Sequence, residues 1–334
     1  MKLAKIALVL ILGLCIIGGV FAGGRQAREG TRVFITGTSG PADTQSMGLF
    51  DMRDRLNAFG GWNAEARVSS EMGSTDDITE QALQGAPVIN PTDPSRLAAN
   101  VPEFGILMMP FLLDDYSQLQ TIMATPLYAE WVRRLREENI ILLTKGITGW
   151  RNWVTNRPIR NPADLSGQRI RTMGNPIAIN SVGAMGAVPI AMAQSEAYHA
   201  IQTGVVDGGE WQLPTIYSLR LFEVANHISL SRHFLLTVSI IAGRPWYDTL
   251  SPVQQTQLRD AATIAFRDNV DVVIRYEQEF LNRMRTQHGV IVEENPDREA
   301  FRARTLHLYS DMATTGGADF EALRTELFRQ IGRR

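Results

Sequence analysis

Apolar residues along this chain of 334 residues alternate between short strand-like runs and longer stretches with helical spacing. Residues 31–36 alternate β-branched and polar positions, which predicts a strand, and residues 42–59 repeat apolar side chains at helical intervals. Residues 140–144 are almost all apolar, which is typical of a parallel strand that is covered on both faces. The repeated alternation predicts an α/β fold in which helices cover parallel sheets.

The longest helical pattern begins at Ser251 and continues to the residue before Gly289. Ser251 is a favourable N-cap, Pro252 suits the first helical position, and Gly289 is a natural C-terminal stop. The pattern is longer than an ordinary globular helix, so it predicts either two helices that meet at a bend or one helix that bridges two domains. From residue 297 onward, the pattern predicts two amphipathic helices separated at residues 316–317.

The N-terminus begins with two lysines and continues with an apolar run over residues 6–20, followed by a small residue at Ala22. This pattern predicts a secretory signal peptide over residues 1–22 that is removed after Ala22. One alternative is a retained membrane anchor, for which the apolar run is short. Another is a lipid-modified cysteine at Cys15. Leu14 is a poor residue before a lipidation site, and the apolar run continues past Cys15, so cleavage is the favoured interpretation.

Composition narrows the class of protein further. The formal net charge of −2 gives no electrostatic basis for nucleic-acid binding. Cys15 is the single cysteine, so a chain without its leader depends on an apolar core and has enough residues for two domains. No later apolar run approaches the length of a membrane span. These features predict an exported, globular protein.

Two arginines lie where the pattern places the ends of strands. Arg171 ends a short predicted strand just before Gly174, and Arg151 occupies the corresponding position one strand–helix unit earlier. Open α/β sheets bind ligands at the carboxyl ends of their strands, and a guanidinium group pairs with a carboxylate through two parallel hydrogen bonds. A carboxylate site is one interpretation. Two solvated surface arginines are the simpler interpretation of the pattern alone.

The segment after Arg171 contains further candidates. Ser195 is a possible N-cap of the next helix, and Glu196 would complement the dipole of that helix. Glu210 and Trp211 follow a glycine-containing turn and could line a pocket. Trp211 could equally be a core residue, and the sequence does not decide between these two interpretations.

Catalytic, metal and cofactor motifs are weak. The five histidines are scattered without the H-E-x-x-H spacing of zinc enzymes, and no G-x-S-x-G nucleophile motif is present. The loop at residues 37–41 lacks the lysine and the glycine spacing of phosphate-binding loops. The sequence therefore predicts no catalytic residue, no metal and no cofactor.

Many short motifs occur in the same order as in one known family. The chain resembles the solute-binding proteins of tripartite ATP-independent periplasmic (TRAP) transporters, the DctP family. The motifs extend through most of the chain after the leader, and their order carries the resemblance more than any single motif. They lie at residues 72–77, 101–105, 110–112, 149–151, 156–159, 164–167, 169–171, 195–198 and 202–208.

The resemblance implies a type II periplasmic-binding-protein fold, with two α/β lobes, crossover strands and a long helix that spans both. Lobe I would comprise residues 31–148 and about 237–276, and lobe II residues 149–236 and about 277–330. It implies a periplasmic receptor that binds a small carboxylate in the interlobe cleft and closes over it by a hinge motion. The closed receptor would deliver its ligand to membrane permease subunits. It would act as a monomer, without nucleic acid and without catalysing a reaction.

The resemblance also assigns roles to residues. Arg171 would clamp the ligand carboxylate with the help of Arg151. Asp76, which lies in a matching motif, and Glu210 are further candidate ligand-binding residues. A sensory or scaffold protein on the same fold, acting through a partner protein and not a permease, is the alternative. A secreted hydrolase would need a nucleophile with a partnered base, and the sequence suggests none.

Two positions depart from the family pattern. Gln194 stands where Phe is common before Ser-Glu, and Trp211 stands where Asn is frequent. An indole offers apolar area and stacking but a single hydrogen-bond donor. Both residues are candidate ligand contacts. Their identity favours a monocarboxylate with an apolar, aromatic or keto-acid body over a sugar acid or a C4-dicarboxylate.

Overall fold

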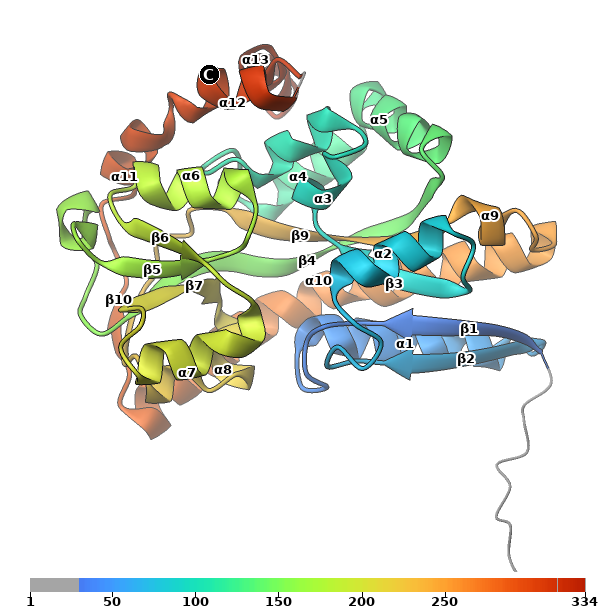
Figure 1. Ribbon diagram of the computed structural model, residues 1–334, viewed down its shortest axis with the longest axis horizontal. Coiled ribbons are helices and arrows are strands. Elements are labelled where there is room, and N and C mark those ends of the chain that lie inside the picture. The colour runs from blue at the N-terminus through green and yellow to red at the C-terminus, as the bar shows by residue number, and fades with distance from the viewer. Residues whose placement is uncertain (1–29, 317, 334) are drawn as a thin grey trace, which may run out of the picture.

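Figure 1 shows a computed structural model of the chain, which describes residues 30–316 and 318–333. The predicted signal peptide and Cys15 lie outside the described residues. No helix within the described ranges is long and apolar enough to cross a membrane.

The strands form two α/β halves that are joined by two shared strands, β4 and β9 (Figure 1). The order is β2-β1-β3-β9-β4-β7-β5-β6, with β8 beside β4 and β10 beside β8. β1, β2 and β3 pair in parallel, and so do β5, β6 and β7. The bounds are β1 Thr31–Thr36, β2 Trp62–Arg67, β3 Val88–Thr92, β4 Ile140–Thr155, β5 Arg169–Thr172, β6 Val188–Ala191, β7 Gly208–Gln212, β8 His227–Ser229, β9 Leu235–Gly243 and β10 Ile291–Glu293.

Helices cover both halves, as the alternating pattern predicts. The α-helices are α1 Thr44–Ala58, α2 Thr75–Leu83, α3 Pro94–Leu97, α4 Tyr116–Met123, α5 Pro126–Glu137, α6 Pro176–Ala184, α7 Ala197–Gln202, α8 Leu213–Ser218, α9 Arg244–Tyr247, α10 Pro252–His288, α11 Arg298–Thr305, α12 Leu308–Gly316 and α13 Phe320–Gln330. Short 3-10 helices within the described ranges are η1 Pro102–Met108, η2 Pro162–Leu165, η3 Gln194–Glu196 and η4 Leu221–Glu223. The described residues after Asp297 form three helices, α11, α12 and α13, so the prediction of two is wrong.

β4 carries the chain from one half to the other. Its first part pairs antiparallel with β9, and its last residues pair antiparallel with β7 and β8. The prediction of a parallel strand at residues 140–144 is therefore wrong in direction. The strand is buried because an apolar core covers each of its faces: Ile140 belongs to one core and Ile141 to another. A continuous apolar run reports this burial and carries no information about strand direction.

α10 is one unbroken helix that lies along both halves (Figure 1). Ser251 and Gln254 form a reciprocal capping box at its start, and Gly289 ends it in the left-handed conformation with a φ of 68°. Phe266 packs into a core with β1 and α1, whereas Phe280 packs into a core with β7 and α8. The structure therefore selects the single bridging helix over two helices that meet at a bend.

The apolar cores only partly follow the predicted lobe boundaries. Tyr309 and Leu327, from the C-terminal helices, share a core with Leu107 and Trp131. The prediction places residues 308–330 in lobe II, but α13 packs against η1 and α4, whereas α12 contacts α6. The two-lobed fold is clear, and the lobe boundaries stay a prediction.

Candidate functional site

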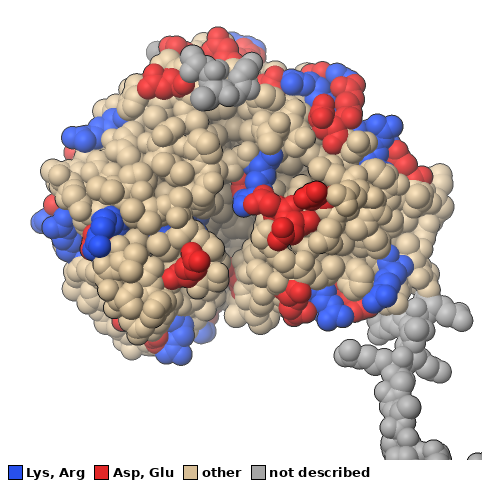
Figure 2. Space-filling view, in the orientation of Figure 1, with Lys and Arg blue, Asp and Glu red and all other residues tan. Residues whose placement is uncertain are grey.

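A hollow separates the two halves of the molecule, and charged side chains gather on its margin over α2 and α3 (Figure 2). β4 and β9 pass from one half to the other beside it, so side chains near their midpoints can reach both halves. The carboxyl ends of parallel strands are where open α/β sheets bind ligands. The hollow is therefore the region in which to examine the predicted site residues.

Arg171 lies at the carboxyl end of β5, as predicted, and its side chain is nearly buried at 4 % exposure. Its Nε and Nη2 donate to the carbonyl oxygen of Met192 at 3.2 and 3.0 Å, and its guanidinium lies 4.9 Å from the centre of the Trp211 ring. Among the described residues, no carboxylate forms an ion pair with Arg171. Burial and then the nearby charge of Arg151 lower the pKa of Arg171 to about 10, so the side chain stays cationic at neutral pH.

Trp211 serves both as a core residue and as the platform under Arg171. Its side chain is fully buried in the core that Phe280 joins, while the ring faces the guanidinium. Gly209 pairs with Arg171 across β7 and β5 and leaves room for this ring, because a Cβ there would lie 2.2 Å from it. The indole Nε1 of Trp211 has no hydrogen-bond partner within the described part of the chain.

Arg151 is held in a closed network with Glu210. It lies within β4, four residues before the last strand residue, so the prediction that it ends a strand is wrong. Its Nε forms an ion pair with Glu210 Oε2, and its Nη2 donates to the Glu210 carbonyl oxygen. Thr172 Oγ1 donates to Glu210 Oε1 at 2.8 Å, and His233 Nε2 lies 3.4 Å from Oε2. Glu210 thus neutralises Arg151 inside the protein.

The chemistry of Glu210 follows from this network. Burial alone would raise the pKa of its carboxyl group, but the charge of Arg151 and the hydrogen bonds from His233 and Arg151 lower that pKa to about 2. Burial lowers the pKa of His233, whose ring stacks on Trp153 at 4.5 Å between centroids. Glu210 is therefore an ionised, structural carboxylate at neutral pH.

Neither Asp76 nor Gln194 forms a hydrogen bond with Arg151 or Arg171 among the described residues. Asp76 is exposed at the start of α2 and pairs with Arg96 at 2.6 Å. Arg96 also pairs with Asp93, which joins α2 to α3. Gln194 is partly buried at the start of η3. The predicted N-cap at Ser195 is wrong, because this segment is a 3-10 turn in which the Glu196 carboxylate accepts from the amide of Ala193 at 3.3 Å.

Sequence reasoning missed several polar residues of this region. His233 and Thr172 complete the network around Glu210, and Arg96 forms an ion pair with Asp93 at the start of α3. Thr172 directly follows Arg171, so its place at the strand end was a usable signal. His233 had no such signal, because only the pairing of β4 with the segment before β9 brings it beside Arg151.

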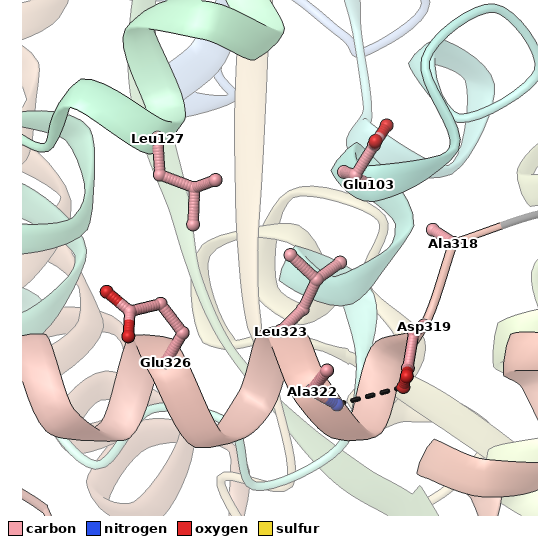
Figure 3. A pocket seen from close by; sticks show the side chains of 7 residues that line it. All are labelled: Glu103, Leu127, Ala318, Asp319, Ala322, Leu323 and Glu326. Atoms are coloured by element: carbon pink, nitrogen blue, oxygen red, sulfur yellow. Dashed lines mark hydrogen bonds between the residues drawn. The ribbon is translucent and has the colours of Figure 1, made fainter.

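Two other depressions lie outside this hollow, and the first of them suits an acidic solute poorly. One depression of about 370 Å³ lies along α13, where Leu323 and Leu127 face one another between Glu103 and Glu326 (Figure 3). A second, of about 390 Å³, lies between α6 and α12. The first has an acidic and apolar lining, which repels a carboxylate. No group of three or more metal-ligating side chains occurs in the part of the chain that the structure describes.

A family model and related sequences match most of this chain. The model "DctP: Bacterial extracellular solute-binding protein, family 7" matches residues 52–315. The 2,3-diketo-L-gulonate-binding periplasmic protein YiaO of Escherichia coli is 28% identical over 240 residues, which cover 72% of this chain and 70% of that protein. The ectoine-binding periplasmic protein TeaA of Halomonas elongata is 28% identical over 236 residues, covering 70% of this chain and 69% of TeaA.

A solved structure has the same fold. The TRAP periplasmic solute-binding protein from Ochrobacterium anthropi, with bound L-fuconate, superposes with a TM-score of 0.83 at 27% sequence identity. The match covers 89% of this chain and 99% of that one. The two-lobed architecture is therefore that of the TRAP solute-binding proteins.

Proposed function

We propose that this chain, which belongs to the DctP family of bacterial extracellular solute-binding proteins, binds a small organic monocarboxylate in the hollow between its lobes and delivers it to the membrane subunits of a TRAP transporter. The family consists of periplasmic receptors that bind solutes, and they are not enzymes. The predicted signal peptide would place this chain in the same compartment.

The observation that carries the proposal is the unpaired charge of Arg171. A buried cation is costly unless a counter-charge or hydrogen bonds compensate it. Arg171 has a carbonyl oxygen and an aromatic face as partners, and no carboxylate pairs with it among the described residues. A ligand carboxylate would supply the missing charge through the remaining guanidinium donors.

The neighbours of Arg171 favour a compact acid over a long polyol. Trp211 presents an apolar wall beside the guanidinium, and its indole N–H has no acceptor within the described ranges. A 2-oxo or 2-hydroxy oxygen next to the carboxylate would accept that hydrogen bond. We therefore place 2-oxo and aromatic monocarboxylates ahead of the sugar acids named for several relatives.

Mass spectrometry of the solute released from purified, unfolded protein tests this function. We expect a monocarboxylic acid, and isothermal titration with pyruvate, phenylpyruvate, D-glucuronate and L-galactonate then ranks the acid classes. A released amine or neutral sugar, with no binding of any of the four acids, would contradict the proposal.

Delivery to a permease is tested separately. Vesicles that contain the small and large membrane subunits should accumulate the bound acid only when the purified receptor is added together with an ion gradient. Uptake at the same rate without the receptor would contradict the transport role.

A further inference from the structure

The chain crosses between the lobes in β4 at Gly149 and Trp150. The β4–β9 register shifts between Ile147 and Gly149, and pairing with β7 begins at Arg151, the next residue after Trp150. Gly149 has a φ of +119°, a conformation that other residues adopt only with strain. The crossing is therefore one of two irregular points in the β4–β9 pairing, and it lies directly before a charged residue of the candidate site.

One carboxylate from α10 holds this crossing. Glu277 Oε1 accepts the backbone N–H of Trp150 at 2.9 Å, and Glu277 Oε2 accepts the hydroxyl of Tyr116 at 2.6 Å. A Cβ on Gly149 would lie 2.6 Å from Glu277 Oε1, so the glycine provides the space that this carboxylate occupies. The Tyr116 ring also packs against the Trp150 ring, with centroids 5.7 Å apart.

We propose that Glu277 is a positioning residue for ligand capture, which ties the interlobe crossing of β4 to α10 and α4 and so fixes the direction from which lobe II presents Arg151. The proposal rests on the proposed receptor function, because it explains how the two lobes meet around a solute. Among the described residues, no hydrogen bond or ion pair joins Glu277 to Arg151. It acts through the Trp150 amide, one residue before that arginine.

The contacts distinguish this carboxylate from a neighbouring acidic residue on α10, Glu279. Glu279, two residues further along, pairs with Arg283 on the surface of the same helix. Both carboxylate oxygens of Glu277 instead accept hydrogen bonds from groups outside α10, one in β4 and one in α4. Burial raises the pKa of Glu277 and the two hydrogen bonds oppose that rise, which fits an acceptor built into the fold. A surface ion pair needs no such arrangement.

Interlobe distances measured by spin labels test the proposal without any ligand. Labels at Val205→Cys and Val253→Cys, in a Cys15→Ser background, occupy exposed positions in the two lobes. We expect Glu277→Ala to broaden the distance distribution, because the crossing loses its anchor. Glu277→Gln should keep it narrow, since an amide oxygen can still accept the Trp150 N–H.

Titration adds a functional readout. When a receptor adopts its binding-competent arrangement less often, its apparent affinity falls in proportion. We therefore expect Glu277→Ala to lower the affinity for the tightest-binding of the four acids by about tenfold. Glu277→Gln and the surface control Glu279→Ala should bind as the parent protein does. If Glu277→Ala does not fold, Tyr116→Phe, which removes one hydrogen bond to Glu277, should produce a smaller broadening.

Two results would overturn the proposal. One is an unchanged distance distribution in Glu277→Ala, or in Tyr116→Phe where that variant replaces it. The other is an equal broadening in Phe266→Leu, a core variant of lobe I chosen for a similar loss of thermal stability. If none of the four acids binds while the distances change as expected, the proposed ligand class fails and the hinge role of Glu277 stands.

Discussion

Arg151 and Arg171 lie close together in the half of the sheet formed by β4, β7 and β5, and both are buried, at 2 % and 4 % exposure, but their surroundings differ. Arg151 is neutralised by Glu210 within a network that includes His233 and Thr172. Arg171 pairs with a carbonyl oxygen and a tryptophan ring. One arginine is satisfied by the protein, and the other presents a charge that a ligand can meet.

This difference separates two roles that the sequence presents as one. The order of motifs treats both arginines as carboxylate contacts. We propose that Arg171 is the clamp and that Arg151, whose charge lowers the pKa of Arg171, has a supporting part. Arg151 would shape the field around the ligand carboxylate without pairing with it directly. The following predictions test that division.

Removing the partner of Arg151 should have the largest effect on folding. Glu210→Ala leaves a buried guanidinium without its counter-charge, which costs about 3–5 kcal/mol in the free energy of unfolding. Chemical denaturation of the parent and the variant measures the difference. If the stability stays within about 1 kcal/mol of the parent protein, Arg151 does not depend on Glu210 as its counter-charge and is also available to a ligand carboxylate.

The same network predicts a pH dependence. The pKa of Glu210 is about 2 in the folded protein, against 4.5 for an ordinary glutamate, so its carboxylate stabilises the fold above pH 4.5. That contribution, up to about 3 kcal/mol, is lost as the pH falls from 4.5 towards 2. Glu210→Gln should flatten this part of the stability curve in denaturation series at several pH values. An unchanged slope in Glu210→Gln would show that other groups cause it.

Gly209→Ala probes the platform under Arg171. The new methyl group would lie 2.2 Å from the Trp211 ring, which must move, and overpacking of this kind costs about 1–3 kcal/mol. We expect lower stability together with weaker binding of the preferred acid in calorimetry. Gly174→Ala, where no atom lies within 4 Å of the added methyl group, is the control. Parent-like behaviour of Gly209→Ala would remove Trp211 from the site.

The smallest effect is expected at the charged margin. The Asp76–Arg96 pair is exposed, and such pairs contribute less than about 1 kcal/mol. Asp76→Ala should therefore leave the denaturation midpoint almost unchanged. Any effect of this substitution on acid binding should become smaller as the salt concentration rises. A large loss of affinity that persists at high salt would place Asp76 in direct contact with the solute.

The features that a local pattern encodes could be predicted from the sequence. The caps at Ser251 and Gly289 and the place of Arg171 at the end of a short strand each depend on a few neighbouring residues. The α/β class follows from the same alternation. The ordered motifs of the family supplied the two-lobed arrangement, which local pattern alone leaves open.

The rest depends on contacts between distant segments. The antiparallel direction of β4 is set by its pairing with β9, about ninety residues away, and a continuous apolar run cannot report it. The partner of Arg151 is Glu210, which only the pairing of β4 with β7 brings close. His233 and Glu277 entered no prediction for the same reason. Each acquires its role from tertiary packing.

Calorimetry on a matched pair of arginine variants tests the central claim most directly. Arg171 and Arg169 lie two residues apart on β5, but Arg169 is exposed and pairs with Asp207. Arg171→Ala should weaken binding of the preferred acid by about 2–5 kcal/mol, because a buried carboxylate loses its partner, while Arg169→Ala should bind as the parent protein does. Equal affinity in Arg171→Ala and the parent protein would contradict the assignment of Arg171 as the ligand clamp.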